Sequence, residues 1–120
     1  MYRVKKFSQI RRKSKYRNVA TTTDGIRYHS KKEAKYAQDL EFRKKAGLIK
    51  SWERQVRIEL YAYGKHICNY YMDFVIYHND GTVEYVEIKG YETDVWKIKW
   101  KLFEAMINAQ EPEAILTIVK

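Results

Sequence analysis

The stretch "YVEIKGYETDVWKIKWK", residues 85–101, joins an expected strand to an expected helix. Its first part reads as a β-strand, in which successive side chains point to opposite faces of a sheet. Glu87 and Lys89 therefore point the same way, about 6.6 Å apart along the strand. From Thr93 onward, apolar residues recur at helical spacing. The predicted fold therefore contains a strand that presents an acid and a lysine on one face, followed directly by a basic helix.

The composition predicts one globular domain without a membrane segment. The chain has 120 residues, of which 45% are hydrophobic and 32% charged, as is usual for a domain of this size. No apolar run approaches the roughly 20 residues of a membrane span, and the first residues lack the apolar core of a secretory signal. The single cysteine, Cys68, excludes an internal disulfide and a zinc cluster, so we expect a cytoplasmic protein.

The positive charge is concentrated at the N-terminus. The net charge is +9, and residues 1–17 carry eight basic side chains and no acid, so residues 18–120 sum to 9 − 8 = +1. We therefore divide the chain into a basic arm, residues 1–17, and a domain, residues 18–120. An arm of this kind suits a nucleic-acid backbone, and a solubilising tail is the alternative. The candidate DNA contacts in the arm are Arg11, Arg12, Lys13, Lys15 and Arg17.

The remaining patterns predict strands and helices in a defined order. Asp24-Gly25 between β-prone runs indicates a hairpin, Ser30 followed by Glu33 indicates a helix start, and Pro112 ends a later helix. The predicted elements are a hairpin within 18–30, a helix within 30–49, a strand within 51–64, two strands within 66–90 joined by a turn at 78–81, a helix over 93–110 and a buried strand over 114–119. This order predicts an α/β fold with a mixed central sheet flanked by helices.

Both predicted helices have apolar faces, and the second has two. For the first helix, the expected apolar face is Ala34, Ala37, Leu40 and Phe42. For the second helix, one stripe is Val95, Ile98, Leu102 and Met106, and the other is Trp96, Trp100, Phe103 and Ile107. A monomer of this size need not cover the stripe that contains the two tryptophans, so we expect that stripe to support a homodimer.

An acid inside an apolar strand marks the candidate site. Asp73 interrupts the run "NYYMDFVIY", where an unpaired charge would be costly. Counting outward from the turn at 78–81 places Asp73 almost opposite Glu87 on the neighbouring strand. Two facing carboxylates repel unless a cation lies between them, and Mg²⁺ prefers such hard oxygen ligands. Lys89 would then either orient and help deprotonate an attacking water or stabilise charge on a phosphate.

Each of these residues also has an ordinary structural interpretation. A Glu-x-Lys pair on a strand commonly forms a surface salt bridge. Glu33 fits a helix-capping role as well as a role in the site. For Gln55, a candidate accessory residue, we favour solvent exposure over contact with the site. The candidate DNA contacts on the second helix are Lys97, Lys99 and Lys101. Lys97 and Lys101 form a basic face that suits either phosphate or solvent, and Lys99 is expected to lean toward the site.

The arrangement of Asp73 followed by Glu87-Ile88-Lys89 resembles the PD-(D/E)XK nuclease superfamily. The predicted order of elements is similar to that superfamily's restriction-endonuclease-like αβββαβ core. Three segments in order, "SKKEAKYAQDLEFRKKAGLIKSWERQ", "YMDFVIY" and "VEIKGYETDVWKIKWKLFE", resemble a small phage-encoded family of uncharacterised nuclease-like proteins. For a phage-encoded protein, the compartment would be the host cell cytoplasm.

The resemblance implies a set of roles for these residues. It assigns Asp73, Glu87, the Ile88 carbonyl and Glu33 to a bound Mg²⁺ or Mn²⁺, and Lys89 to catalysis. The proline that usually precedes the aspartate is Met72 here. The implied function is a Mg²⁺-dependent DNA endonuclease, with junction-resolvase-like action on branched or recombination intermediates as one form. The alternative is a non-catalytic nucleic-acid-binding protein on a nuclease-like fold. A third option is a DNA mimic or a protein inhibitor, and the basic arm argues against mimicry of DNA.

Overall fold

The computed structural model describes residues 21–23, 26–28 and 30–120. The predictions for the basic arm, residues 1–17, lie outside the described residues. The elements are β1 (Thr21–Thr23), β2 (Ile26–Tyr28), α1 (Lys31–Lys45), β3 (Ser51–Ala62), β4 (Lys65–Tyr77), β5 (Val83–Ile88), α2 (Asp94–Gln110) and β6 (Ile115–Val119). The predicted order of elements is therefore confirmed.

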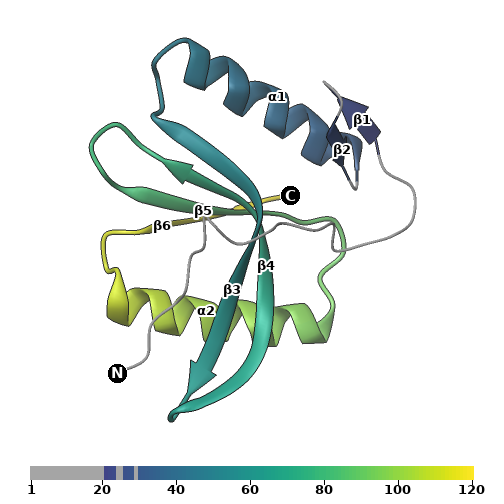
Figure 1. Cartoon of the computed structure of the whole chain (residues 1–120). Helices are drawn as coiled ribbons and strands as arrows, with labels where there is room; N and C mark the ends of the chain where they lie inside the picture. Colours follow the sequence, from purple (N-terminus) through teal and green to yellow (C-terminus); the bar gives the residue numbers. More distant parts are fainter. Residues whose placement is uncertain (1–20, 24–25, 29) are drawn as a thin grey trace.

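A four-stranded mixed sheet forms the centre of the fold. Its strand order is β3-β4-β5-β6, in which the first three strands are antiparallel and β6 pairs parallel to β5. The α2 crossover makes this parallel pairing possible, because parallel neighbours need a long connection. Helices α1 and α2 lie on opposite sides of the sheet (Figure 1). From α1 onward the elements follow the order αβββαβ, and β1 and β2 form a separate hairpin before it.

The predicted turns and helix ends are present. β1 and β2 pair antiparallel with Thr23 opposite Ile26, which confirms the hairpin, although residues 24–25 lie outside the described part. α1 begins at the predicted cap, where the Ser30 hydroxyl oxygen accepts a hydrogen bond of 3.1 Å from the Glu33 amide. It ends just before Gly47, whose φ of +77° is in the left-handed region that favours glycine.

Two hydrophobic cores lie on the two faces of the sheet. The core on the α1 side consists of Ala34, Ala37, Leu40, Ile49, Phe74, Ile76, Val86 and Ile88. The core on the α2 side consists of Val56, Ile58, Leu60, Tyr70, Met72, Val75, Tyr85, Trp96, Trp100, Phe103, Met106 and Ile107. Residues that alternate along β5 enter alternate cores, as they must in a pleated strand.

The β3–β4 hairpin twists, so that side chains two positions apart change from one core to the other partway along each strand. In β4, Met72 belongs to the α2-side core, but Phe74, two residues later, belongs to the α1-side core. In β3, Trp52 packs on the α1 side and Val56 on the α2 side. Residues two apart share a face in a regular strand, so both strands reverse at one level. At that level Gln55 has a φ of +51°, a conformation that costs a non-glycine residue of order 1–3 kcal/mol.

Three sequence predictions about faces are wrong. Phe42 is 68% exposed, because it follows Leu40 by two positions and so lies nearly opposite it on the helix. The stripe of Trp96, Trp100, Phe103 and Ile107 is buried against the sheet and so is not a free dimer surface. The last strand, β6, is not buried: it is the edge of the sheet, and Ile115 and Ile118 remain 42% and 37% exposed.

Candidate functional site

Three polar side chains form a row across the middle of the sheet. The β4–β5 register pairs Phe74 with Val86, so the next step sets Asp73 opposite Glu87, as predicted. The β3–β4 register places Gln55 beside Asp73 in the same way, since the residues on either side of Gln55 pair with those on either side of Asp73. The exposed fractions of Gln55, Asp73 and Glu87 are 1%, 1% and 0%. The row therefore lies inside the protein, where polar groups need defined partners.

The Asp73 carboxylate is held by two donors. The Gln55 side-chain amide donates to Oδ1 at 3.1 Å, and the Ile88 main-chain amide donates to Oδ2 at 2.8 Å. Hydrogen bonds to a charged acceptor are the stronger kind, so the carboxylate has a fixed orientation next to β5. The sequence pattern favours solvent exposure for Gln55. That prediction is wrong, because the hairpin turns over at Gln55 and directs its side chain to Asp73.

Lys89 lies between the acid and an aromatic ring. Its Nζ is 3.7 Å from Glu87 Oε2 and 4.9 Å from the centroid of the Trp96 ring. Residues two positions apart in a strand lie on the same face of the sheet, which explains why Glu87 and Lys89 are close together. The Lys89 side chain is 13% exposed, and exposed Gly90 follows it. The ammonium group thus lies between buried Glu87 and the surface.

Tyr70 lies next to Trp96, the residue whose ring packs against Lys89. Its hydroxyl oxygen accepts a hydrogen bond of 2.8 Å from the Trp96 indole N–H. Burial, and then the nearby charge of Glu87, raise the pKa of Tyr70 far above its ordinary value. The raised pKa favours the protonated hydroxyl. Tyr70 is therefore suited to orient its neighbours through hydrogen bonds.

The residues present fit a cation held by two carboxylates. Asp73 and Glu87 offer oxygen ligands, and Mg²⁺ usually binds through one or two carboxylates, with water and substrate phosphate as further ligands. Within the described ranges, no group of three or more His, Cys, Asp and Glu side chains is arranged to hold a metal. Glu33, buried on α1, is therefore not gathered with the two strand carboxylates into such a group.

Replacing Glu33 distinguishes its two predicted roles. Glutamine can serve in a capping box as glutamate does, so we expect Glu33→Gln to melt like the wild type. Glu33→Ala should lose about 0.5–2 kcal/mol in the free energy of unfolding, by analogy with other caps. If Glu33 assists the site, as the resemblance predicts, Glu33→Gln should fold normally. It should cleave DNA more slowly, however, and require more Mg²⁺. Thermal melts and Mg²⁺ titrations of cleavage measure both; full activity of Glu33→Gln would confine Glu33 to the helix start.

The lysines of α2 that are predicted to contact DNA occupy two environments. Lys97 and Lys101 are exposed one turn apart and present charge to solvent. Lys99 is half-buried, and its Nζ donates to the Asn69 carbonyl at 3.4 Å, so it lies against β4. The arm residues Arg11, Arg12, Lys13, Lys15 and Arg17 lie outside the described part of the chain.

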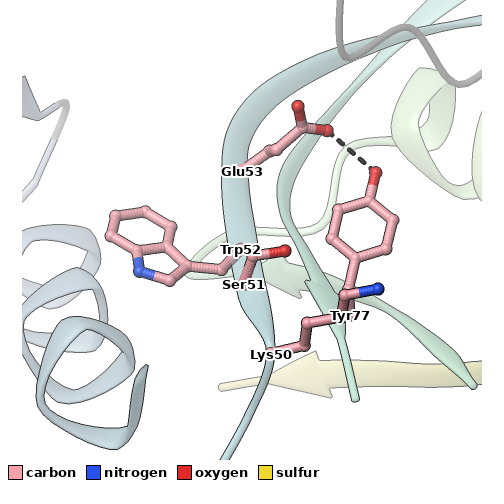
Figure 2. A pocket seen from close by; sticks show the side chains of 5 residues that line it. All are labelled: Lys50, Ser51, Trp52, Glu53 and Tyr77. Atoms are coloured by element: carbon pink, nitrogen blue, oxygen red, sulfur yellow. Dashed lines mark hydrogen bonds between the residues drawn. The ribbon is translucent and has the colours of Figure 1, made fainter. Parts of the chain in front are cut away.

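A separate pocket lies where β3 begins and β4 ends. Figure 2 shows Trp52 pointing toward α1, whereas Glu53 and Tyr77 lie together on the other side of β3. The Tyr77 hydroxyl donates to Glu53 at 2.8 Å, and the Trp52 indole donates to Glu41 at 3.0 Å. The pocket is lined by Lys50, Ser51, Trp52, Glu53 and Tyr77. None of the predicted site residues lines it, and these hydrogen bonds join its elements to one another.

The fold and the site together define a small α/β protein with a buried acid–acid–lysine cluster at the end of a central strand. The chain belongs to the DUF1064 family, described as proteins of unknown function, whose family model matches residues 13–118. No curated protein and no solved structure matches the chain. In the part of the chain that the structure describes, no helix is long and apolar enough to cross a membrane.

Proposed function

We propose that this protein is a Mg²⁺- or Mn²⁺-dependent endonuclease that hydrolyses phosphodiester bonds in DNA. The observation that carries the proposal lies at the end of β5, where Asp73 accepts a hydrogen bond from the Ile88 amide and Lys89 lies 3.7 Å from Glu87. These are the residues through which the sequence resembles the PD-(D/E)XK nucleases. The burial of the two acids supports the proposal too, because keeping carboxylates out of water costs stability.

The side chains divide the work of hydrolysis among them. Asp73 and Glu87, with the Ile88 carbonyl, would hold the cation, and a bound Mg²⁺ supplies Lewis-acid polarisation of a phosphoryl oxygen. Lys89, between Glu87 and the face of Trp96, carries a positive charge toward the surface. Of its two predicted roles, this environment favours stabilising the charge that develops on the phosphate. Gln55 keeps Asp73 in its orientation by holding one of its oxygens.

A non-catalytic nucleic-acid-binding protein is the second candidate, and one observation favours it. Both oxygens of Asp73 already accept hydrogen bonds from the protein, and Glu87 contacts Lys89. A cluster of this kind can serve as a structural network in the interior. The two candidates share their DNA contacts, the arm residues together with Lys97 and Lys101, and differ only in whether cleavage occurs.

Incubating the full chain with Mg²⁺ and a panel of DNA substrates tests the proposal. The panel contains duplex, single-stranded, flap and four-way-junction DNA, each labelled on one strand at a time. We expect strand cleavage of at least one substrate, and the junction and flap arms test whether branched DNA is preferred. Binding without cleavage of every substrate, with Mg²⁺ and with Mn²⁺, would leave the non-catalytic candidate.

Deleting residues 1–15 tests the role of the basic arm. Phosphate contacts release counterions, so each phosphate that the arm neutralises steepens the fall of log affinity with log salt by roughly 0.9 on duplex DNA. We expect the truncated chain to bind all sequences more weakly. Its slope should be shallower by about that amount for every phosphate that only the arm reaches. Fluorescence anisotropy over a salt series measures the slope, and an unchanged slope would show that the arm does not touch the DNA backbone.

A further inference from the structure

An apolar stripe runs along α2 beside the face that is buried against the sheet. Its members follow one another at alternating spacings of three and four residues, the pattern of a seam that packs against another helix. The two bulky members near the start of α2, Val95 and Ile98, are 64% and 69% exposed. This stripe is distinct from the buried stripe of tryptophans on the same helix. It consists of Val95, Ile98, Leu102, Ala105 and Ala109.

The two halves of the stripe differ in shape. The first half carries the exposed branched side chains of Val95 and Ile98. Leu102, next along the stripe, is half-buried and also packs against the α2-side core. The second half carries the exposed alanines Ala105 and Ala109. Beside these alanines runs a groove between α2 and the tip of the β3–β4 hairpin, whose side is formed by Tyr61, Ala62 and Tyr63. One helix therefore presents a projecting half and a hollow half.

We propose that this stripe binds a second copy of the same chain, with the two α2 helices antiparallel about a two-fold axis. With the axis between Phe103 and Glu104, Ile98 of each copy faces Ala109 of the other copy, and Leu102 faces Ala105. Each contact then joins a large side chain to a small one, and Ile98 enters the groove of the other copy. Such self-complementarity is what a two-fold interface requires, and it fills space without voids.

The charges beside the stripe agree with this pairing. In the antiparallel arrangement Lys101 faces Asn108 of the other copy, with Glu104 of that copy one turn away, so no like charges meet at this flank. A parallel pair would instead set Ile98 against Ile98 and alanine against alanine, and would leave gaps beside Ala105 and Ala109. This match of one half of the helix to the other half favours a second copy over an unrelated partner. The inference does not rest on the proposed function.

Sedimentation velocity of the full chain over about 1–100 μM tests the assembly, a range that suits a small interface. We expect a concentration-dependent dimer for the wild type. Ile98→Lys should weaken it at least about tenfold. At about 1 μM, the dilute end of that range, its melting temperature should stay close to that of the wild type, because the side chain is exposed in the monomer. Leu48→Lys, a matched change at an apolar residue that is 62% exposed on the α1–β3 connection, should leave it unchanged. A wild type that stays monomeric throughout would overturn the proposal, as would equal effects of the two variants.

Disulfide cross-linking tests the orientation. In a Cys68→Ser background, Ile98→Cys combined with Ala109→Cys should give covalent dimers under mild oxidation. The two positions are roughly 16 Å apart along one helix, so they cannot bridge within a chain. Ile98→Cys without the second cysteine should give no covalent dimer, since the two copies of position 98 are equally far apart in the antiparallel dimer. Rapid cross-linking of that single variant would indicate a parallel pair and overturn the proposed arrangement.

Discussion

Lys89→Ala is expected to slow DNA cleavage by on the order of 10²–10³-fold, the usual cost of removing one donor that stabilises developing charge. The Lys89 side chain carries a positive charge next to Glu87, and alanine leaves no charge there. DNA binding should change little, because affinity comes mainly from phosphate contacts spread over the protein. Single-turnover cleavage in Mg²⁺ and anisotropy in its absence separate these two quantities.

Lys44→Ala is the matched control for this experiment, since it removes the same side chain from an exposed position on α1. It should cleave like the wild type. The variants Asp73→Ala and Glu87→Ala should lose cleavage as well and retain binding, because each removes one of the two proposed cation ligands. Full activity of Lys89→Ala would exclude Lys89 from catalysis and favour a purely structural role for its contact with Glu87.

Phe103→Ala is expected to cause the largest loss of stability, about 3–5 kcal/mol in the free energy of unfolding. Phe103 is fully buried, and its ring packs within 5.1–5.8 Å, between ring centroids, of Tyr70, Tyr85 and Trp100. Truncation would leave a cavity at the centre of the α2-side core. Since small domains have only about 5–15 kcal/mol in total, the variant should be close to unfolding. Urea denaturation followed by circular dichroism measures the change.

Phe42→Ala provides the comparison for Phe103→Ala. The same truncation at this exposed position should alter the free energy of unfolding by less than about 0.5 kcal/mol. The sequence pattern places both residues on apolar faces, but only Phe103 has a core to fill. Similar losses for the two variants would contradict the assignment of α2 as the helix that covers the large core.

The candidate site was predictable as far as local rules reach. The turn at residues 78–81 fixes the hairpin register, so counting from it is enough to bring Asp73 opposite Glu87. Strand alternation is enough to put Lys89 on the same face as Glu87. Both deductions depend on short-range geometry that a sequence records directly, and the register of β4 and β5 confirms the first of them.

The position of Gln55 could not be deduced in the same way. Its side chain reaches Asp73 because the β3–β4 hairpin turns over, a twist imposed by the need to cover two cores at once. The irregular alternation of apolar and polar residues in "SWERQVRIEL" was the available signal. Trp52 and Val56 are an even number of positions apart, but they enter different cores. For α2, the sequence shows two apolar stripes, but only the sheet decides that the stripe with the tryptophans is buried.

We propose that Asp73, Glu87 and Lys89 form a cation-dependent hydrolytic site. Its most direct test compares cleavage of a labelled four-way junction and of duplex DNA by the wild type and Asp73→Asn, purified identically and assayed with Mg²⁺ and with a chelator. Asparagine keeps the size of the side chain and an acceptor for the Ile88 amide, but it removes the charge. Only the wild type with Mg²⁺ should give product. Equal cleavage by the two proteins, or none by the wild type on any DNA, would contradict it.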